Sequence, residues 1–104
     1  MLEIKLRKEL ACPVIVCDHC GEEIIDALNA NAIWQENLDK DQTPGNVFFV
    51  HKECDLLFQR KRSDPSKTWC WNGLDVWLLY LTNNVSWDAK KAKQTADRLA
   101  GLQP

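Results

Sequence analysis

The chain has 104 residues, of which 45% are hydrophobic and 27% charged, and its formal net charge is -2. This size fits a single domain, and the composition is that of a globular protein, which excludes a disordered tail. Because there is neither a bilayer-spanning apolar run nor a charged-then-apolar leader, we expect a cytoplasmic protein. An odd number of cysteines, five, predicts metal ligands and spare thiols before disulfides.

Short strands are predicted for the first half of the chain. In LEIKLR, apolar Leu2, Ile4 and Leu6 alternate with charged residues, which predicts a half-buried strand over residues 2–8. Pro13 precedes a β-branched run that is typical of a strand leading into the first cysteine pair. The further strands expected here are 14–17, 22–25, 31–35 and 46–50, with a turn or loop at 39–46.

Two pairs of metal-ligand residues share the same spacing. Cys17 and Cys20 are three residues apart, and after thirty more residues His51 and Cys54 repeat that offset. Two cysteines at this spacing form a knuckle, and residues at i and i+3 share one face of a helix. Three thiolates and one imidazole match the tetrahedral preference of zinc and leave no position open for substrate. The pattern C-x2-C-x30-H-x2-C therefore predicts one structural zinc ion.

Other uses of these cysteines remain open at this point. A thioredoxin-like redox pair at Cys17 and Cys20 fits less well, because such a pair lies between a strand and a helix of a parallel sheet. His19 is expected to be exposed in the knuckle and not a ligand. Cys12 and Cys70 are interpreted as spare thiols, although Cys70 is an alternative fourth ligand.

The quoted residues carry a resemblance to a known class of fold. Cys17-x2-Cys20, a hairpin-length segment and HKEC at the start of a helix resemble a treble-clef zinc finger over residues 14–62. They resemble more loosely the first half of a LIM domain, although no second cysteine pair follows, and small bacterial zinc-finger proteins of unassigned role. The resemblance implies an α+β fold of small antiparallel hairpins around the zinc site. We expect one domain over 1–104, with C-terminal helices of a helical segment 66–102 packed on the finger.

Three helices are predicted from His51 onward. The helix that begins with HKEC is expected to end before Pro65. A second helix over 74–85, with Asn72 as its N-cap, is apolar on nearly every side, which predicts burial on two faces or contact with a partner. A third begins at Ser86 and ends near Gly101. Its apolar seam is Ala89, Ala92, Ala96 and Leu99.

The remaining residues bear on function. No catalytic triad, phosphate loop or deaminase motif is present, so we do not expect an enzyme. The most favoured function is a protein-interaction module, acting on an unidentified partner or by self-association through the helix at 74–81. The alternative is a small nucleic-acid-binding or transcription-associated finger that uses Arg60, Lys61 and Arg62. Trp34 and Trp77 are predicted in the core. Trp69 and Trp71 stay open between core and interface, because their alternation can place both rings on one face of an extended segment.

Overall fold

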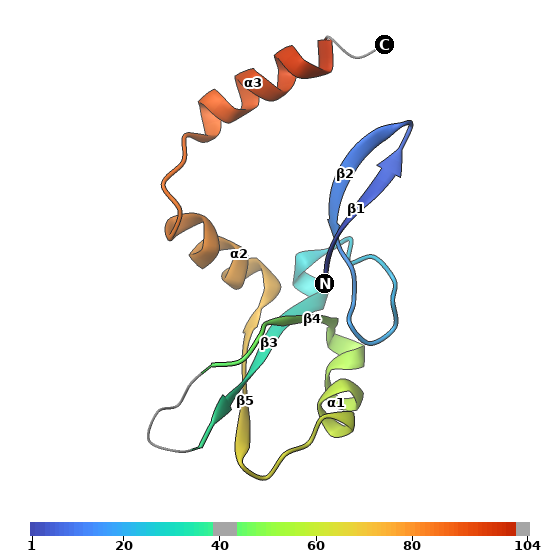
Figure 1. Cartoon of the computed structure of the whole chain (residues 1–104), viewed down its shortest axis with the longest axis vertical. Coiled ribbons are helices and arrows are strands. Elements are labelled where there is room, and N and C mark those ends of the chain that lie inside the picture. Colours follow the sequence, from blue (N-terminus) through green and yellow to red (C-terminus); the bar gives the residue numbers. More distant parts are fainter. Residues whose placement is uncertain (39–43, 102–104) are drawn as a thin grey trace.

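The structure, a computed structural model, describes residues 1–38 and 44–101. Within these residues the chain forms two antiparallel sheets, three α-helices and one short 3-10 helix (Figure 1). The mixture confirms the expected α+β class. The elements are β1 (Leu2–Arg7), β2 (Leu10–Ile15), η1 (Ala27–Asn29), β3 (Ala30–Asn37), β4 (Phe48–His51), α1 (Lys52–Lys61), β5 (Lys67–Gly73), α2 (Leu74–Asn83) and α3 (Ala89–Gly101).

The first sheet is a two-stranded hairpin of β1 and β2. The strand expected at 2–8 is confirmed up to Arg7, but β2 begins at Leu10, earlier than expected. The turn consists of Lys8 and Glu9, whose φ angles are 50° and 66°. Both φ angles are positive, as in the type I′ turns that close two-residue hairpins. Because Lys-Glu is not one of the residue pairs that favour this turn, the hairpin was not predicted.

The expectation that the first strand is half-buried is wrong. Leu2, Ile4 and Leu6 are 69%, 67% and 77% exposed. The alternating pattern correctly places these side chains on one face of the hairpin, but no other described element covers that face. The pattern therefore specified the strand and not its burial.

The second sheet has the strand order β4-β3-β5. In the register, Ile33 of β3 pairs with Phe48 of β4 on one side and with Trp71 of β5 on the other. The strands expected at 31–35 and 46–50 are thereby confirmed in substance. The prediction of a strand at 22–25 is wrong, because this segment forms only an isolated β-bridge between Glu23 and Val16. Of the loop expected at 39–46, residues 39–43 lie outside the described part of the chain.

The expected helical segment 66–102 begins instead with a strand. Residues Lys67–Gly73 form β5, which is rich in the Trp and Thr residues that favour strands. Trp69 and Trp71 lie on the same face of β5, as predicted from their alternation. Trp69 is half-buried, whereas Trp71 is 64% exposed. The second half of the chain thus completes the sheet that begins between the two ligand pairs.

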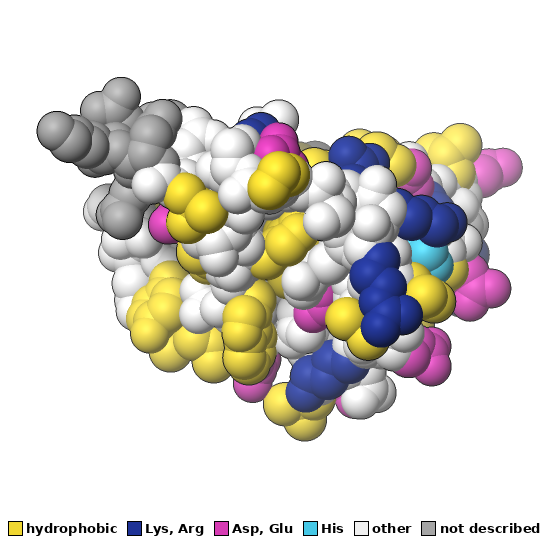
Figure 2. Space-filling model, turned by 90° about the horizontal axis from the view of Figure 1, so that it is seen from below, with side chains coloured by type: hydrophobic (Ala, Val, Ile, Leu, Met, Phe, Trp, Pro, Cys, Tyr) yellow, Lys and Arg dark blue, Asp and Glu magenta, His cyan; other side chains and the backbone are white. Residues whose placement is uncertain are grey.

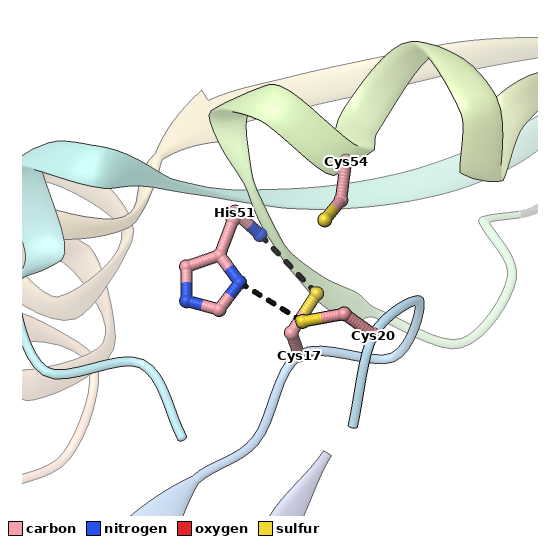
Figure 3. Close-up of side chains that lie close together, drawn as sticks. All are labelled: Cys17, Cys20, His51 and Cys54. Carbon is pink, nitrogen blue, oxygen red and sulfur yellow. Dashed lines mark hydrogen bonds between the residues drawn. The ribbon is translucent and has the colours of Figure 1, made fainter. Parts of the chain in front are cut away.

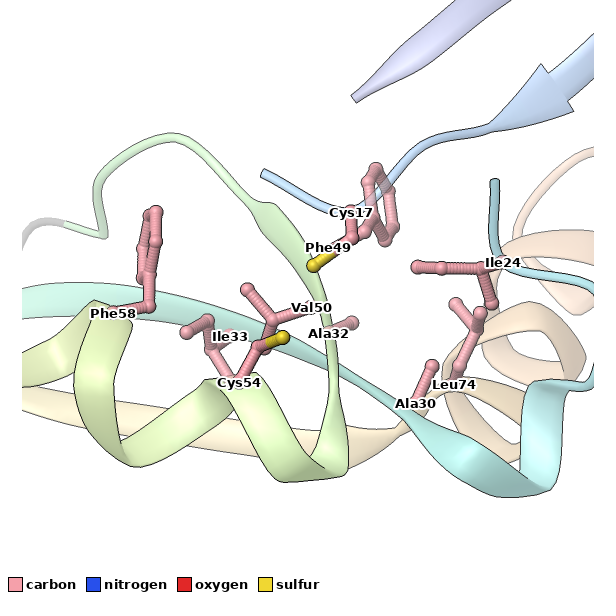
Figure 4. Packing of buried hydrophobic residues seen from close by; sticks show 10 residues of the cluster. All are labelled: Cys17, Ile24, Ala30, Ala32, Ile33, Phe49, Val50, Cys54, Phe58 and Leu74. Carbon is pink, nitrogen blue, oxygen red and sulfur yellow. The ribbon is translucent and has the colours of Figure 1, made fainter. Parts of the chain in front are cut away.

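The core lies on both faces of the three-stranded sheet (Figure 4). Adjacent residues of a strand point to opposite faces, so Phe48 and Phe49 each meet a different helix. Phe48 contacts Phe58 of α1 at a ring-centroid distance of 5.1 Å, and Phe49 contacts Trp77 of α2 at 5.0 Å. The two helices therefore cover opposite faces of the sheet. Among the described residues, those with no exposed surface are Ala30, Ala32, Ile33 and Val50.

The two C-terminal helices pack less than expected. In α2 only Leu74 is fully buried, while Trp77 and Leu78 are half-buried and the opposite side is exposed, so burial on two faces is not observed. Its N-cap is Gly73, not Asn72. Trp34 is likewise only half-buried, with its indole N–H donating to Glu36.

Helix α3 stands apart from the rest of the molecule (Figure 1). It makes no extensive contact with any other described element, so its expected packing on the finger is wrong. The amide of Lys91 donates to the Asp88 carboxylate at 3.0 Å, which makes Asp88, not Ser86, the capping residue. Across residues 1–38 and 44–101, no helix is long and apolar enough to cross a membrane.

Candidate metal centre

Four side chains from three parts of the fold converge at one point (Figure 3). Cys17 and Cys20 come from the loop that follows β2, His51 ends β4, and Cys54 lies in the first turn of α1. Their ligand atoms all lie within 4.8 Å of one another. The two pairs found in the sequence are therefore one cluster, positioned to hold one metal ion.

The distances within the cluster suit tetrahedral coordination. A zinc ion with Zn–S bonds of about 2.3 Å and a Zn–N bond of about 2.0 Å places its ligand atoms roughly 3.5–3.8 Å apart. The Cys20 Sγ lies 3.4 Å from the His51 Nδ1. Cys17 and Cys54 are buried, His51 is half-buried and Cys20 is exposed, so the centre lies at the edge of the core. All five cysteines of the chain carry free thiols.

The cysteine pair is held in a tight knuckle. The Gly21 amide donates to the Cys17 carbonyl at 3.0 Å, and Gly21 has a φ of 78°. This left-handed conformation strains residues with a Cβ, which explains why glycine follows the second cysteine. The loop then returns, and the Cys17 amide donates to the Glu22 carbonyl at 2.8 Å.

Asp18 connects the knuckle to β4. Its amide donates to the Phe49 carbonyl at 2.7 Å, and its carboxylate accepts from the Phe49 amide at 2.8 Å. This pair of bonds brings the loop of Cys17 against the strand that ends at His51. Sequence reasoning missed this role, because an aspartate between two cysteines reads as an exposed loop residue.

The second pair of donors is positioned by the junction of β4 and α1. His51 is the N-cap residue of α1 and Cys54 lies one turn later, so both point from the N-terminal end of the helix. The partial positive charge of that end favours thiolates. Asp55 fixes the helix on the sheet by accepting from the side-chain amide of Asn31 on β3 at 2.9 Å. Within α1, it also accepts from the side-chain amide of Gln59 at 2.6 Å.

The pKa values of the two buried thiols, Cys17 and Cys54, are shifted in opposite directions. Burial raises the pKa of Cys17, but hydrogen bonds from nearby backbone N–H groups, first those of Cys20 and His51, outweigh it and lower the pKa to about 7. Burial, followed by the charge of Cys17, raises the pKa of Cys54 to about 12. Three sulfurs this close repel one another as thiolates, so a bound cation favours the ionised forms of all three.

The other candidate residues lie outside the cluster. Among the described residues, His19, Cys12 and Cys70 do not belong to any group of metal-ligating side chains. His19 is half-buried, not exposed as expected. Cys70 lies on β5 opposite Trp34, where burial and then the neighbouring Glu36 raise the pKa of its thiol. The alternative in which Cys70 is the fourth ligand has no geometric support.

The basic residues are not gathered at the metal centre. Arg60 and Lys61 are exposed at the C-terminal end of α1. The guanidinium of Arg62 lies over the rings of Phe48 and Phe58, 4.9 Å and 4.8 Å from their centroids, and so makes cation–π contacts within the fold. On the face drawn in Figure 2, lysine and arginine side chains lie among acidic and hydrophobic ones.

A hollow of about 430 Å³ beside the centre is lined by Asn29, His51, Lys52 and Glu53. It opens to solvent next to the half-buried His51.

No family model, curated protein or solved structure matches this chain. The function of the centre therefore has to be inferred from its own donors and geometry.

Proposed function

We propose that Cys17, Cys20, His51 and Cys54 bind one zinc ion and that this ion is structural. The observation that carries the proposal is the convergence of three sulfurs and one imidazole nitrogen within 4.8 Å. This donor set is soft and tetrahedral, as zinc prefers, and four protein ligands complete its coordination.

The path of the chain supports a treble-clef finger. A knuckle with two donors, an antiparallel pair of strands and a helix with two donors at its start follow one another between Cys17 and Lys61. In this arrangement the ion joins the knuckle to the helix across the hairpin. The zinc-bound fold is then the finger that the sequence resembles.

A redox role for Cys17 and Cys20 is less well supported. Every strand pair in the described chain is antiparallel, and Cys20 is followed by a loop and not by a helix. Moreover, both thiols have further metal donors within reach. We therefore propose structural and not redox chemistry for this pair.

The proposed role of the protein is a non-enzymatic interaction module. A closed four-donor site supplies folding energy, on the order of 10 kcal/mol for structural zinc. This energy stabilises a fold whose core is small and whose outer α2 side chains are exposed, including Leu79 and Tyr80 at 57% and 53%. Exposed apolar side chains of this size are typical of surfaces that bind protein.

Metal content measured by elemental analysis tests the proposal. The wild-type chain and a Cys70→Ser control are expected to carry one zinc ion per chain. Cys54→Ser and Cys17→Ser are expected to lose the ion and the cooperative unfolding transition together. A metal-free but folded wild-type chain would contradict the proposal, as would equal loss of metal in Cys70→Ser.

Titration with nucleic acid separates this role from the alternative. A binder that uses Arg60, Lys61 and Arg62 would show affinity for DNA or RNA that falls steeply with salt. We propose protein binding instead, because Arg62 is already engaged by two rings. We expect no nucleic-acid binding at low salt, measured by fluorescence anisotropy.

A further inference from the structure

The chain exposes much more surface than a compact protein of its size. Its accessible surface is 8051 Å², whereas a folded monomer of 12.0 kDa has about 6,000 Å². Its radius of gyration is 16.8 Å, against about 13 Å for a compact domain of this length. The excess of about 2,000 Å² per chain is what an obligate homodimer buries.

One part of the excess is an entirely apolar face of the hairpin. Residues directly opposite one another in an antiparallel pair share a face. Leu2, Ile4 and Leu6 of β1 lie opposite Ile15, Pro13 and Ala11 of β2, so that all six side chains of this face are apolar. A two-stranded hairpin is marginal in water unless a further element packs on it.

Helix α3 is the matching part. Its apolar seam of Ala89, Ala92, Ala96 and Leu99 is exposed, and small side chains allow a helix to approach a flat sheet closely. Thirteen helical residues extend about 20 Å. The six residues of each hairpin strand also extend about 20 Å. The seam and the hairpin face therefore agree in length and in polarity.

The charge that complements α3 lies in the loop beside the hairpin and not in the hairpin itself, whose residues 2–15 carry three cationic side chains and two carboxylates. Four cationic side chains and one carboxylate give α3 a formal charge of +3, so the rest of the chain, out of a total of -2, carries -5. An acidic loop borders the hairpin. Its Glu23 forms an ion pair with Arg7 of β1 and an isolated backbone β-bridge with Val16, which follows β2. Glu22 and Asp26 belong to the same loop.

We propose that a second copy of this chain occupies the open surface, with α3 of each copy lying on the β1–β2 face of the other. The inference rests on the proposed interaction role and names its partner. A two-fold exchange covers both apolar surfaces of both chains at once, because the contact made by one copy is repeated by the other. In Figure 1, α3 and the hairpin reach toward the same end of the molecule without extensive contact between them.

Sedimentation equilibrium of the zinc-loaded full chain tests the exchange. The wild type is expected to have the mass of two chains at micromolar concentration. Ile4→Glu and Leu99→Lys are each expected to weaken self-association roughly 30-fold or more, as loss of an interface hot spot does. The matched control is Leu56→Glu on α1, where the leucine is 59% exposed, and it is expected to leave the dimer intact.

Mixing the two weakened variants distinguishes exchange from a helix that folds onto its own hairpin. In a mixed dimer, the wild-type α3 of the Ile4→Glu chain meets the wild-type hairpin of the Leu99→Lys chain. Association of the mixture is therefore expected to exceed that of either variant alone. A monomeric wild type, or variants that mixing does not rescue, would overturn the exchange.

Metal content of the same samples keeps the two proposals separate. A monomer that carries one zinc ion contradicts the dimer alone, whereas a chain without zinc contradicts the proposed function. A dimer disrupted by Leu56→Glu as strongly as by Ile4→Glu would place the interface elsewhere and overturn the inference.

Discussion

At the scale of single residues, the candidate metal centre combines two thiols whose pKa values are shifted in opposite directions. Backbone N–H groups stabilise the Cys17 thiolate, while burial and the charge of Cys17 disfavour that of Cys54. Without a cation, the centre therefore holds one sulfur ready to bind and one that retains its proton. Asp18, by contrast, acts through the backbone and fixes the knuckle on β4.

Metal affinity is expected to depend on pH through these two thiols. Near pH 8, binding displaces the proton of Cys54, whose pKa is raised to about 12, but not that of Cys17. Below about pH 7, the Cys17 thiolate also takes up a proton. Affinity should thus fall with decreasing pH and fall more steeply, by about one further proton per ion, below pH 7. Competition with a chelator between pH 6 and 8 measures this.

The two shifted pKa values link folding to pH in opposite directions. The lowered pKa of Cys17 contributes stability that is present above the ordinary thiol pKa of 9.0 and is lost as the pH falls through about 7. The raised pKa of Cys54 contributes stability that is present below pH 9.0 and is lost as the pH rises toward 12.

Cys70→Ser is the control for the pH dependence of metal affinity and should keep the wild-type pH profile. A metal affinity that does not depend on pH would contradict thiolate ligation.

At the scale of elements, the hairpin is weakly supported by the rest of the fold. Its turn places Lys8 and Glu9 at positive φ, where residues with a Cβ are strained. On its apolar face, Leu2, Ile4 and Leu6 are not covered by any other element among the described residues. Both features indicate that the hairpin depends on an additional contact, whereas the sheet between α1 and α2 is held by buried aromatic residues.

Replacing Lys8-Glu9 by Asn-Gly should stabilise the hairpin. Asn and Gly adopt positive φ readily, so we expect a gain of about 1 kcal/mol. Amide hydrogen exchange of the β1 and β2 residues measures it locally. Gln at both positions, which removes the charges but keeps the strained turn, is the control. Slower exchange in the Gln variant as well would mean that charge, and not backbone strain, limits the hairpin.

At the scale of the whole molecule, the described chain divides into a packed part and an extended surface. The packed part is the candidate metal centre with the sheet β4-β3-β5 and helices α1 and α2. The hairpin and α3 extend away from it and give the molecule its extents of 53 × 30 × 19 Å. The first part contains the buried core, and the second provides the surface on which we propose dimerisation.

A chain that ends at Asn84 tests this division. Because α3 contributes little to the core, the shortened chain should keep one zinc ion and a cooperative unfolding transition, measured by elemental analysis and denaturant titration. It should also be a monomer by sedimentation, since the helix that covers the partner's hairpin is missing. Loss of zinc would mean that α3 stabilises the candidate metal centre, and a persistent dimer would contradict the exchange.

The metal centre and most elements near it were predictable from the sequence, because their signals are local. Equal three-residue spacing of Cys17, Cys20, His51 and Cys54 identified the cluster, and apolar patterns located β3, β4, α1 and α2. Only the tertiary structure showed that Lys67–Gly73 completes the sheet and that Lys8 and Glu9 form a turn. Strand pairing joins residues distant in sequence, and an unfavourable turn is adopted when the strands on either side pair. Burial of Leu2, Ile4 and Leu6 was mispredicted for the same reason: alternation defines a face, whereas its cover depends on the packing of other elements.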